Sequence, residues 1–483
     1  MEDTNLKHKA AGAAVWNLIE RFGIQLVFLI TGIILARILN VGDYALVGML
    51  AIFTAISSIL TDSGFSVALI REKDVNNIDF SSVFVFNIFI SGILYIILFL
   101  SAPLIAGFYN QPDLIPLSRV MFLAIPINAF GLIQNVVLSR RVRFKKLAQI
   151  NLTAMILSGA LALTMAFTGK GVWALAAQSV GYAACRTSGL WLTHVWNLSF
   201  KFRIERLKKH FYFSVNLLIT SLLNAAFINL YSLFIGRYFP KEQMGYYTQG
   251  NKFAEIPNGI LTGPIQNMSL TVFSKIQDDE NRLVRACRKS MRSLSFMIFP
   301  VIFGLISIAK PLFLTLLGDK WEGMIFFFQL ICIANIFTTF SALNNIFLNI
   351  KGHSRTILHL EILKIALLVI SLFFSIRYGI IAMLYGLIAV RFLCFIIGAY
   401  VSGKKTGYSI WMQLKDLAPY LAISLIMAIL VYSWTFIINN HYLLLTLQII
   451  TGALFYIIVN EKTGSKVYKD TKEMILKRFL PDK

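Results

Sequence analysis

Charged side chains inside long apolar segments are the residues of this sequence with the clearest chemical potential. The set comprises Glu20, Arg21, Asp62, Arg186, Lys252, Glu255, Glu361, Lys364 and Arg391. Ionisable residues in apolar membrane segments are rare, and they usually face the interior of a helix bundle or a water-filled cavity. The set leans positive, and an arginine can bind a phosphate or pyrophosphate through two parallel hydrogen bonds. The pattern therefore favours a cavity that accepts an anionic ligand.

The individual residues differ in how strongly they indicate a function. Glu20 and Arg21 are neighbours, so they point in different directions on a helix and each needs its own partner or water. Arg21 and Lys252 are the main candidates for binding an anionic substrate, and the second group of candidates is Arg186, Arg391 and Glu20. Asp62 and Glu255 are candidates for coupling to an ion or proton, although Asp62 also suits a local hydrogen bond of the capping type.

Two prolines lie close to Lys252 and Glu255 in one apolar segment. Pro257 and Pro264 each remove a backbone donor and can bend a helix. We interpret this segment as a candidate hinge, and a static kink filled by packing is the alternative.

The composition predicts that these residues lie in a membrane. Of 483 residues, 57% are hydrophobic and 14% are charged, whereas a soluble domain carries about 25% charged residues. The apolar runs are continuous and long, so α-helices rather than barrel strands satisfy the backbone. We expect an all-α integral membrane protein with about fourteen spans. Their predicted limits are 13–37, 44–70, 81–108, 117–139, 148–168, 171–196, 212–236, 244–273, 293–318, 322–350, 356–377, 379–402, 417–438 and 441–460.

The net charge of +22 collects mainly in alternate loops between the predicted spans. This distribution indicates membrane orientation and contact with anionic lipids rather than nucleic acid, with both termini cytoplasmic. Residues Ser274–Ser293 combine basic side chains with apolar ones at helical spacing, which predicts an interfacial helix. The four cysteines form no metal-binding or redox pair, and no cofactor or metal is expected.

Matching residues about 200 positions apart predict an internal repeat. Arg37 matches Arg237, and two further matches pair Gln134-Asn135 with Asn344-Asn345 and Arg186 with Arg391. We predict two pseudo-symmetric six-helix lobes, 1–196 and 212–402, joined by a cytoplasmic basic linker, 197–211. Two extra helices, 403–460, and a basic tail, 461–483, follow. Parallel repeats of this kind place a site between the lobes and work by rocking.

Several motifs in order resemble the polysaccharide transporter family of Wzx-type flippases. They are Arg37-Ile38-Leu39-Asn40-Val41-Gly42-Asp43-Tyr44, Asp62-Ser63-Gly64-Phe65, Ile235-Gly236-Arg237, Phe273-Ser274-Lys275 and Gly318-Asp319-Lys320-Trp321. The resemblance covers most of residues 10–400, and it is nearest to exporters of the colanic or teichuronic acid type. It implies the MATE-like fold of the MOP exporter superfamily, in a bacterial inner membrane. It also implies an undecaprenyl-pyrophosphate-linked oligosaccharide as substrate, with a polysaccharide polymerase complex as an expected partner.

Three other classes of function compete with this interpretation, and one of them, a structural subunit of a glycan assembly complex, stays open. A cation-coupled multidrug antiporter of the MATE type has the same fold, but it would favour an acidic and aromatic cavity. A membrane enzyme such as a polymerase would need a sizeable outer loop with acidic or metal-binding residues, and the sequence contains none. We therefore expect a transporter rather than an enzyme, and the coupling ion, if any, stays open.

Overall fold

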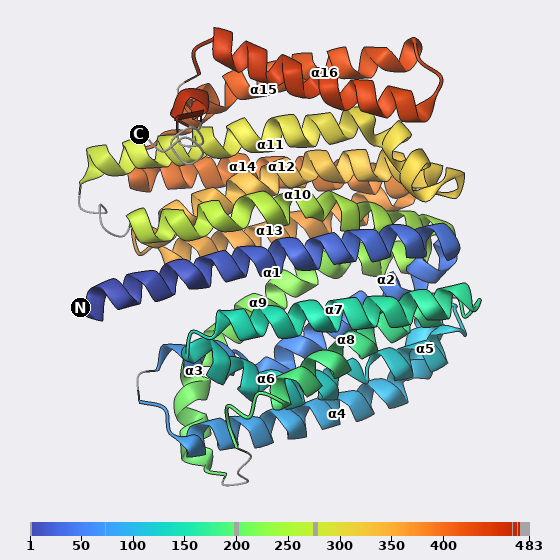
Figure 1. The fold of residues 1–483 in the computed structure, drawn as a ribbon, viewed down its shortest axis with the longest axis vertical. Coiled ribbons are helices and arrows are strands. Elements are labelled where there is room, and N and C mark those ends of the chain that lie inside the picture. Colours follow the sequence, from blue (N-terminus) through green and yellow to red (C-terminus); the bar gives the residue numbers. More distant parts are fainter. Residues whose placement is uncertain are drawn as a thin grey trace. The chain divides into compact units, whose positions relative to one another are not determined.

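The computed structural model describes residues 2–72, 74–197, 202–273, 279–465, 467–470 and 472–473, and these residues form helices and no strands. The first eight helices are α1 (Glu2–Ile38), α2 (Val41–Asp62), α3 (Phe65–Arg71), α4 (Asn77–Tyr109), α5 (Leu114–Met121), α6 (Ala124–Arg140), α7 (Phe144–Phe167) and α8 (Trp173–Trp191). The others are α9 (Ile204–Tyr238), α10 (Lys241–Phe273), α11 (Glu280–Leu317), α12 (Glu322–Ile350), α13 (Ser354–Ser375), α14 (Ile380–Thr406), α15 (Ile410–Ser433) and α16 (His441–Lys462). Figure 1 shows them along the chain.

The predicted all-α membrane fold is confirmed. In the described part of the chain, 12 helical segments are long and apolar enough to cross a membrane. The sixth and eighth predicted spans also exist, as α8 with 19 residues and α10 with 33, but they are too polar to count among the 12. A helix is therefore present in each of the fourteen predicted spans, but only 12 segments have the apolar character of a membrane span.

Two predicted spans are interrupted. Span 44–70 breaks between α2 and α3, because Ser63 and Gly64 both take left-handed backbone angles, with φ of 48° and 74°. Span 117–139 consists of α5 and α6, with residues 122 and 123 between them. Both segments are still long and apolar enough to cross a membrane, as predicted. The sequence did not indicate the breaks, since apolar content alone does not reveal a local change of backbone angle.

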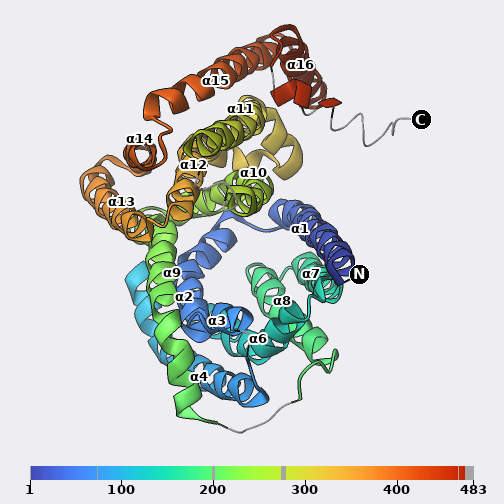
Figure 2. The ribbon, with the colours of Figure 1, turned by 90° about the vertical axis from the view of Figure 1, so that its left-hand side faces the viewer.

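Residues Met1–Thr248 form one compact unit, here called unit 1. Within it α1 packs on α7, α7 on α8, and α9 on α2, α3 and α4, and Figure 2 shows α9 alongside α2 and α4. Close approach of α1 and α7 depends on glycine: a Cβ on Gly159 would lie 2.7 Å from Thr31 Cγ2. Small residues allow this approach between membrane helices.

Residues Gln249–Lys483 form the second compact unit, unit 2. Its α11 packs on α12, α15 and α16, and α12 packs on α14, as Figure 2 shows for α11 and the α15–α16 pair. The boundary at Thr248 lies beyond the predicted linker 197–211, because α9 packs on helices of unit 1. The division into lobes by sequence repeat stays a prediction.

Helix α11 corrects the predicted interfacial helix Ser274–Ser293. The chain forms one helix of 38 residues from Glu280 to Leu317, about 57 Å long. Leu283, Cys287 and Met291 are buried inside unit 2. The amphipathic segment is thus the first half of a packed long helix, and residues 274–278 lie outside the described ones.

Local geometry supports the predicted repeat. Val142 and Gly352, 210 positions apart, both have left-handed angles, with φ of 55° and 75°. The next residue in each case donates a backbone hydrogen bond of 3.0 Å, Arg143 to Leu138 and His353 to Leu348. The same turn therefore joins α6 to α7 and α12 to α13.

Candidate functional site

A chain of polar side chains crosses unit 1 and contains two of the predicted site residues. Arg186 on α8 donates from Nε to Asn151 Oδ1 at 2.8 Å and from Nη2 to Asn135 Oδ1 at 3.0 Å. Asn151 on α7 in turn donates from Nδ2 to Glu20 Oε1 at 2.6 Å. Four helices, α1, α6, α7 and α8, thus contribute to holding one guanidinium. Both direct partners of Arg186 are neutral amides, so its positive charge is oriented without being neutralised by direct contact.

Arg186 also lines a cavity of about 290 Å³ inside unit 1. The other lining residues are Ser58, Thr61, Asp62, Ser66, Ile125, Asn128, Ala129, Leu132 and Asn135, from α2, α3 and α6. The structure therefore brings together Asp62 and Arg186, which the sequence predicted separately for ion coupling and substrate binding.

Asp62 lies at the break between α2 and α3. Its Oδ1 accepts hydrogen bonds from the Ser66 amide at 3.2 Å and from Ser66 Oγ at 2.5 Å. This is the local capping interaction that the sequence left open beside a coupling role. The hydrogen bonds from Ser66 stabilise the break between α2 and α3. Asp62 therefore has a structural role, and it also lines the cavity.

The side chains of Glu20 and Arg21 point in different directions, as the helix geometry predicts. Glu20 is half-buried and bonded to Asn151, whereas the side chain of Arg21 is exposed on α1. Arg21 is not among the residues that line the cavity with Arg186. Any action of Arg21 on a substrate therefore takes place outside that cavity.

Unit 2 contains a related arrangement around Arg391. Arg391 on α14 donates from Nη1 to Asn335 Oδ1 on α12, and Asn335 Nδ2 donates to the Ala254 carbonyl at 3.0 Å. Asn345, the repeat partner of Asn135, instead donates to Glu361 at 3.3 Å. Both arginines are thus held by an asparagine of the neighbouring helix, although at different helical turns.

The remaining predicted residues lie on α10. Lys252 is partly buried, and Glu255 is exposed and accepts a hydrogen bond of 3.1 Å from Asn251. The helix runs through both prolines; Pro257 is buried, and the side chain of Pro264 lies outside the described ones. The hinge role of Pro257 and Pro264 stays a prediction.

Sequence reasoning missed one charged cluster in unit 2. Asp416 on α15, with 1% of its side chain exposed, accepts from Arg288 Nε at 2.8 Å and from Arg292 Nη2 at 2.6 Å. Tyr408 adds a hydroxyl bond of 3.0 Å. The spacing of Arg288 and Arg292, four residues apart on one helix face, was the available signal. Because the predicted span began at 417, Asp416 was assigned to a loop.

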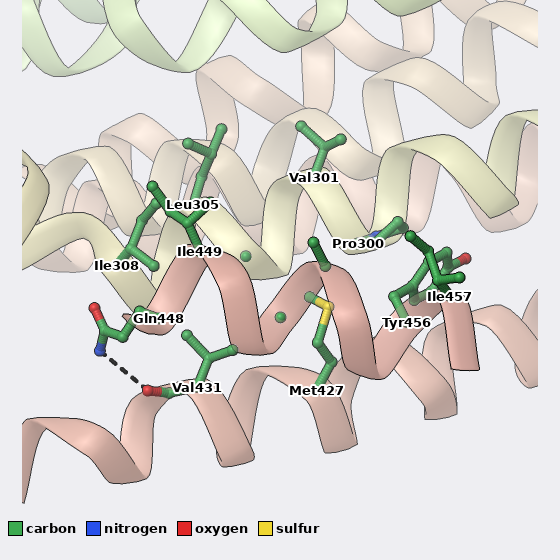
Figure 3. Close-up of a pocket in the computed structure, with 13 residues that line it drawn as sticks. Pro300, Val301, Leu305, Ile308, Met427, Val431, Gln448, Ile449, Tyr456 and Ile457 are labelled. Atoms are coloured by element: carbon green, nitrogen blue, oxygen red, sulfur yellow. Dashed lines mark hydrogen bonds between the residues drawn. The ribbon is translucent and has the colours of Figure 1, made fainter. Parts of the chain in front are cut away.

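An apolar pocket of about 400 Å³ lies between α11, α15 and α16 of unit 2. Figure 3 shows Met427 and Val431 facing Ile449 and Tyr456 across it. Gln448 is tied to the Val431 carbonyl at 3.0 Å. The two helices that follow the predicted repeat, α15 and α16, therefore form an apolar pocket together with α11.

The family described as "Polysaccharide biosynthesis protein" matches residues 34–326, more than half of the chain. The succinoglycan biosynthesis transport protein ExoT of Rhizobium meliloti (strain 1021) is 27% identical over 306 residues, 63% of this chain and 62% of that protein. The teichuronic acid biosynthesis protein TuaB of Bacillus subtilis (strain 168) is 24% identical over 479 residues, 96% of this chain and 97% of that protein. The match thus spans less than two thirds of the first relative and nearly all of the second.

Two solved structures share the fold. The lipid II flippase MurJ in an inward closed conformation superposes with a TM-score of 0.73 at 16% identity, covering 95% of this chain and 99% of MurJ. An inward-facing multidrug resistance MATE transporter of the MOP superfamily gives 0.62 at 16% identity, covering 81% and 98%. The predicted MATE-like fold is confirmed. With this fold and with the family match over residues 34–326, the chain belongs to the polysaccharide biosynthesis protein family, as a multi-pass membrane protein with the architecture of MOP transporters.

Proposed function

We propose that this protein flips undecaprenyl-pyrophosphate-linked oligosaccharide repeat units across the bacterial inner membrane, by alternating access, for surface polysaccharide synthesis. The observation that carries the proposal is Arg186, held by two amides and without a directly bonded carboxylate in the described part of the chain, in a helical bundle of the polysaccharide biosynthesis family. The names of ExoT, a succinoglycan biosynthesis transport protein, and TuaB, a teichuronic acid biosynthesis protein, support a polysaccharide precursor as substrate.

The physical need for such a protein follows from the substrate. A pyrophosphate-sugar head group cannot enter hydrocarbon alone, since an unpaired buried charge costs tens of kcal/mol in the idealised limit. A cationic and hydrated path lowers that cost while the lipid tail stays in the bilayer. Arginines already fixed by amides bind an anion without first losing their own conformational freedom.

We assign the residues as follows. Arg21 and Lys252 bind the pyrophosphate, with help from Arg391, and Arg186, which Glu20 orients through Asn151, contacts another part of the substrate head group. Asp62 and Glu255 remain the candidates for ion or proton coupling, and Pro257 and Pro264 for a hinge. Both termini lie in the cytoplasm, membrane lipids surround the bundle, and a polymerase complex takes over the exported repeat units.

A cation-coupled multidrug antiporter is the second candidate, supported by the MATE structure at a TM-score of 0.62. The charge of the cavity in unit 1 argues against it. A drug cation there would meet the guanidinium of Arg186 together with the carboxylate of Asp62. Because the cavity has one charge of each sign and no excess of acid among its lining residues, it is not complementary to an organic cation.

The test replaces Arg21 and Lys252 by glutamine in a strain that lacks the chromosomal gene. Loss of the cationic groups should trap undecaprenyl-linked repeat units on the cytoplasmic face and reduce surface polymer at least tenfold. Arg377→Gln and Lys170→Gln serve as controls, because both side chains are exposed, Arg377 in a short 3-10 helix before α14 and Lys170 in the connection between α7 and α8. Wild-type export by the Arg21→Gln and Lys252→Gln proteins would contradict the assignment of these two residues.

A further inference from the structure

The cavity in unit 1 contains more neutral hydrogen-bonding groups than a phosphate site needs. Besides Arg186, it is lined by the hydroxyls of Ser58, Thr61 and Ser66 and by the amides of Asn128 and Asn135. Its volume of about 290 Å³ lies near the lower limit of small-molecule pockets, ~300–1,000 Å³. The cavity thus has the size and the lining for a small, strongly hydrogen-bonding group.

Thr61 gives independent evidence that this cavity accepts a ligand. Only 4% of the residue is exposed, and its Oγ1 makes no hydrogen bond within the described part of the chain. Buried hydroxyls nearly always have a partner, because leaving one unsatisfied costs free energy. Thr61 lines the cavity while its Oγ1 itself is buried, so a change of its χ1 rotamer would bring the hydroxyl to a ligand there and complete its hydrogen bonding.

The charges in the cavity define the chemistry of that ligand. Arg186 uses Nε and Nη2 for the two asparagines, and Nη1 makes no hydrogen bond within the described residues, so it is available as a donor. Asp62 brings a carboxylate into the same cavity without an ion pair to Arg186 in the described part of the chain. A phosphate would be repelled by Asp62, and an organic cation by Arg186.

A sugar ring fits both charges at once. Each sugar hydroxyl can donate to a carboxylate and accept from a guanidinium or amide, and both kinds of partner are present here. We propose that this cavity, between α2, α3, α6 and α8, binds a sugar residue of the lipid-linked substrate rather than its pyrophosphate. The inference rests on the proposed function, and it places saccharide recognition inside unit 1.

The experiment compares lipids that differ only in the sugar. Purified full-length protein in nanodiscs is titrated with undecaprenyl pyrophosphate and with undecaprenyl-pyrophosphate-linked glucose, galactose and N-acetylglucosamine. Thr61→Val removes the hydroxyl with little change of shape, and Ser58→Ala does so at an exposed position where folding is not at risk. Consider the glycosylated lipid that the wild type binds most tightly. Each variant should bind this lipid with an affinity lower by ~3–10-fold, which corresponds to the loss of one hydrogen bond. Affinity for sugar-free undecaprenyl pyrophosphate should stay unchanged.

Thr54→Val is the matched control, since Thr54 lies on the same helix and its Oγ1 bonds to the Ala51 carbonyl at 2.9 Å. Equal losses for lipids with and without sugar would overturn the proposal, and so would no loss with any lipid. A sugar-dependent loss in Thr54→Val equal to that in Thr61→Val would also overturn it. Failure of the proposed function is recognised separately, because then the wild-type protein itself would bind none of these lipids.

Discussion

Asn151 and Arg186 form the central contact of unit 1, with Arg186 Nε donating to Asn151 Oδ1 at 2.8 Å between adjacent helices. The same amide donates to Glu20 Oε1 at 2.6 Å. An asparagine at this position links an acid and a base that do not contact each other directly. The contact leaves the guanidinium charged and fixed, as anion or saccharide binding requires.

Asn151→Leu should therefore destabilise unit 1 and reduce export together. The substitution removes two hydrogen bonds to charged groups, each worth about 1.5–3 kcal/mol. We expect the melting temperature of the purified protein to fall by ~5 °C or more. Thr153→Val is the control on the same helix, because the Thr153 side chain is exposed. Equal melting temperatures for Asn151→Leu and wild type would show that the contact contributes little.

Arg186→Lys tests geometry apart from charge. A lysine keeps the positive charge but cannot donate to Asn135 and Asn151 in the fixed fork of a guanidinium. We expect surface polymer to fall at least fivefold at unchanged protein level, measured by quantifying polymer in a complemented deletion strain. Arg377→Lys should export normally. Full export by Arg186→Lys would mean that charge alone matters at this position.

Asp416 should be the most sensitive acid of unit 2. Asp416→Asn leaves Arg288 and Arg292 without their shared carboxylate, which we expect to cost about 2–3 kcal/mol because both guanidinium groups are partly exposed. Limited proteolysis should then release the α15–α16 segment earlier than in wild type. Asp470→Asn is the control, since its pair with Lys289 is exposed and worth under ~1 kcal/mol. Equal rates of proteolysis for Asp416→Asn and Asp470→Asn would contradict a stabilising role for the contact of Asp416 with Arg288 and Arg292.

The repeated turn predicts opposite effects at equivalent positions. Val142 is a β-branched residue at φ 55°, so Val142→Gly should relieve strain of about 1–3 kcal/mol. Gly352 has φ 75° with open space around its Cα, so Gly352→Val should introduce a similar strain. The melting temperature should rise for Val142→Gly and fall for Gly352→Val. Effects of the same sign would contradict the shared turn geometry.

Much of the architecture could be predicted from the sequence because membrane helices follow apolar length. The ends of α1 and α9, at Ile38 and Tyr238, lie within two residues of the predicted ends at 37 and 236. The break after Asp62 was missed, because it depends on the backbone angles of Ser63 and Gly64 rather than on polarity.

The candidate site was predicted in part. Residue type and depth identified Arg186, Glu20 and Asp62, but not Asn151, Asn135 or Thr61, which are neutral and common in membrane helices. Which side chains meet depends on how helices rotate and pack, and a single sequence does not specify this. Asp416 was missed for the same reason, since only the packing of α15 on α11 brings it to Arg288.

Reconstituted transport tests the central claim most directly. Proteoliposomes containing the full-length protein receive undecaprenyl-pyrophosphate-linked N-acetylglucosamine in the outer leaflet, and its loss from that leaflet is followed with a soluble, membrane-impermeant galactosyltransferase. The account predicts protein-dependent movement to the inner leaflet, slowed by Arg21→Gln and Lys252→Gln and unaffected by Lys170→Gln. A lipid that stays in the outer leaflet, together with protein-dependent uptake of a cationic dye, would contradict flipping and favour the antiporter.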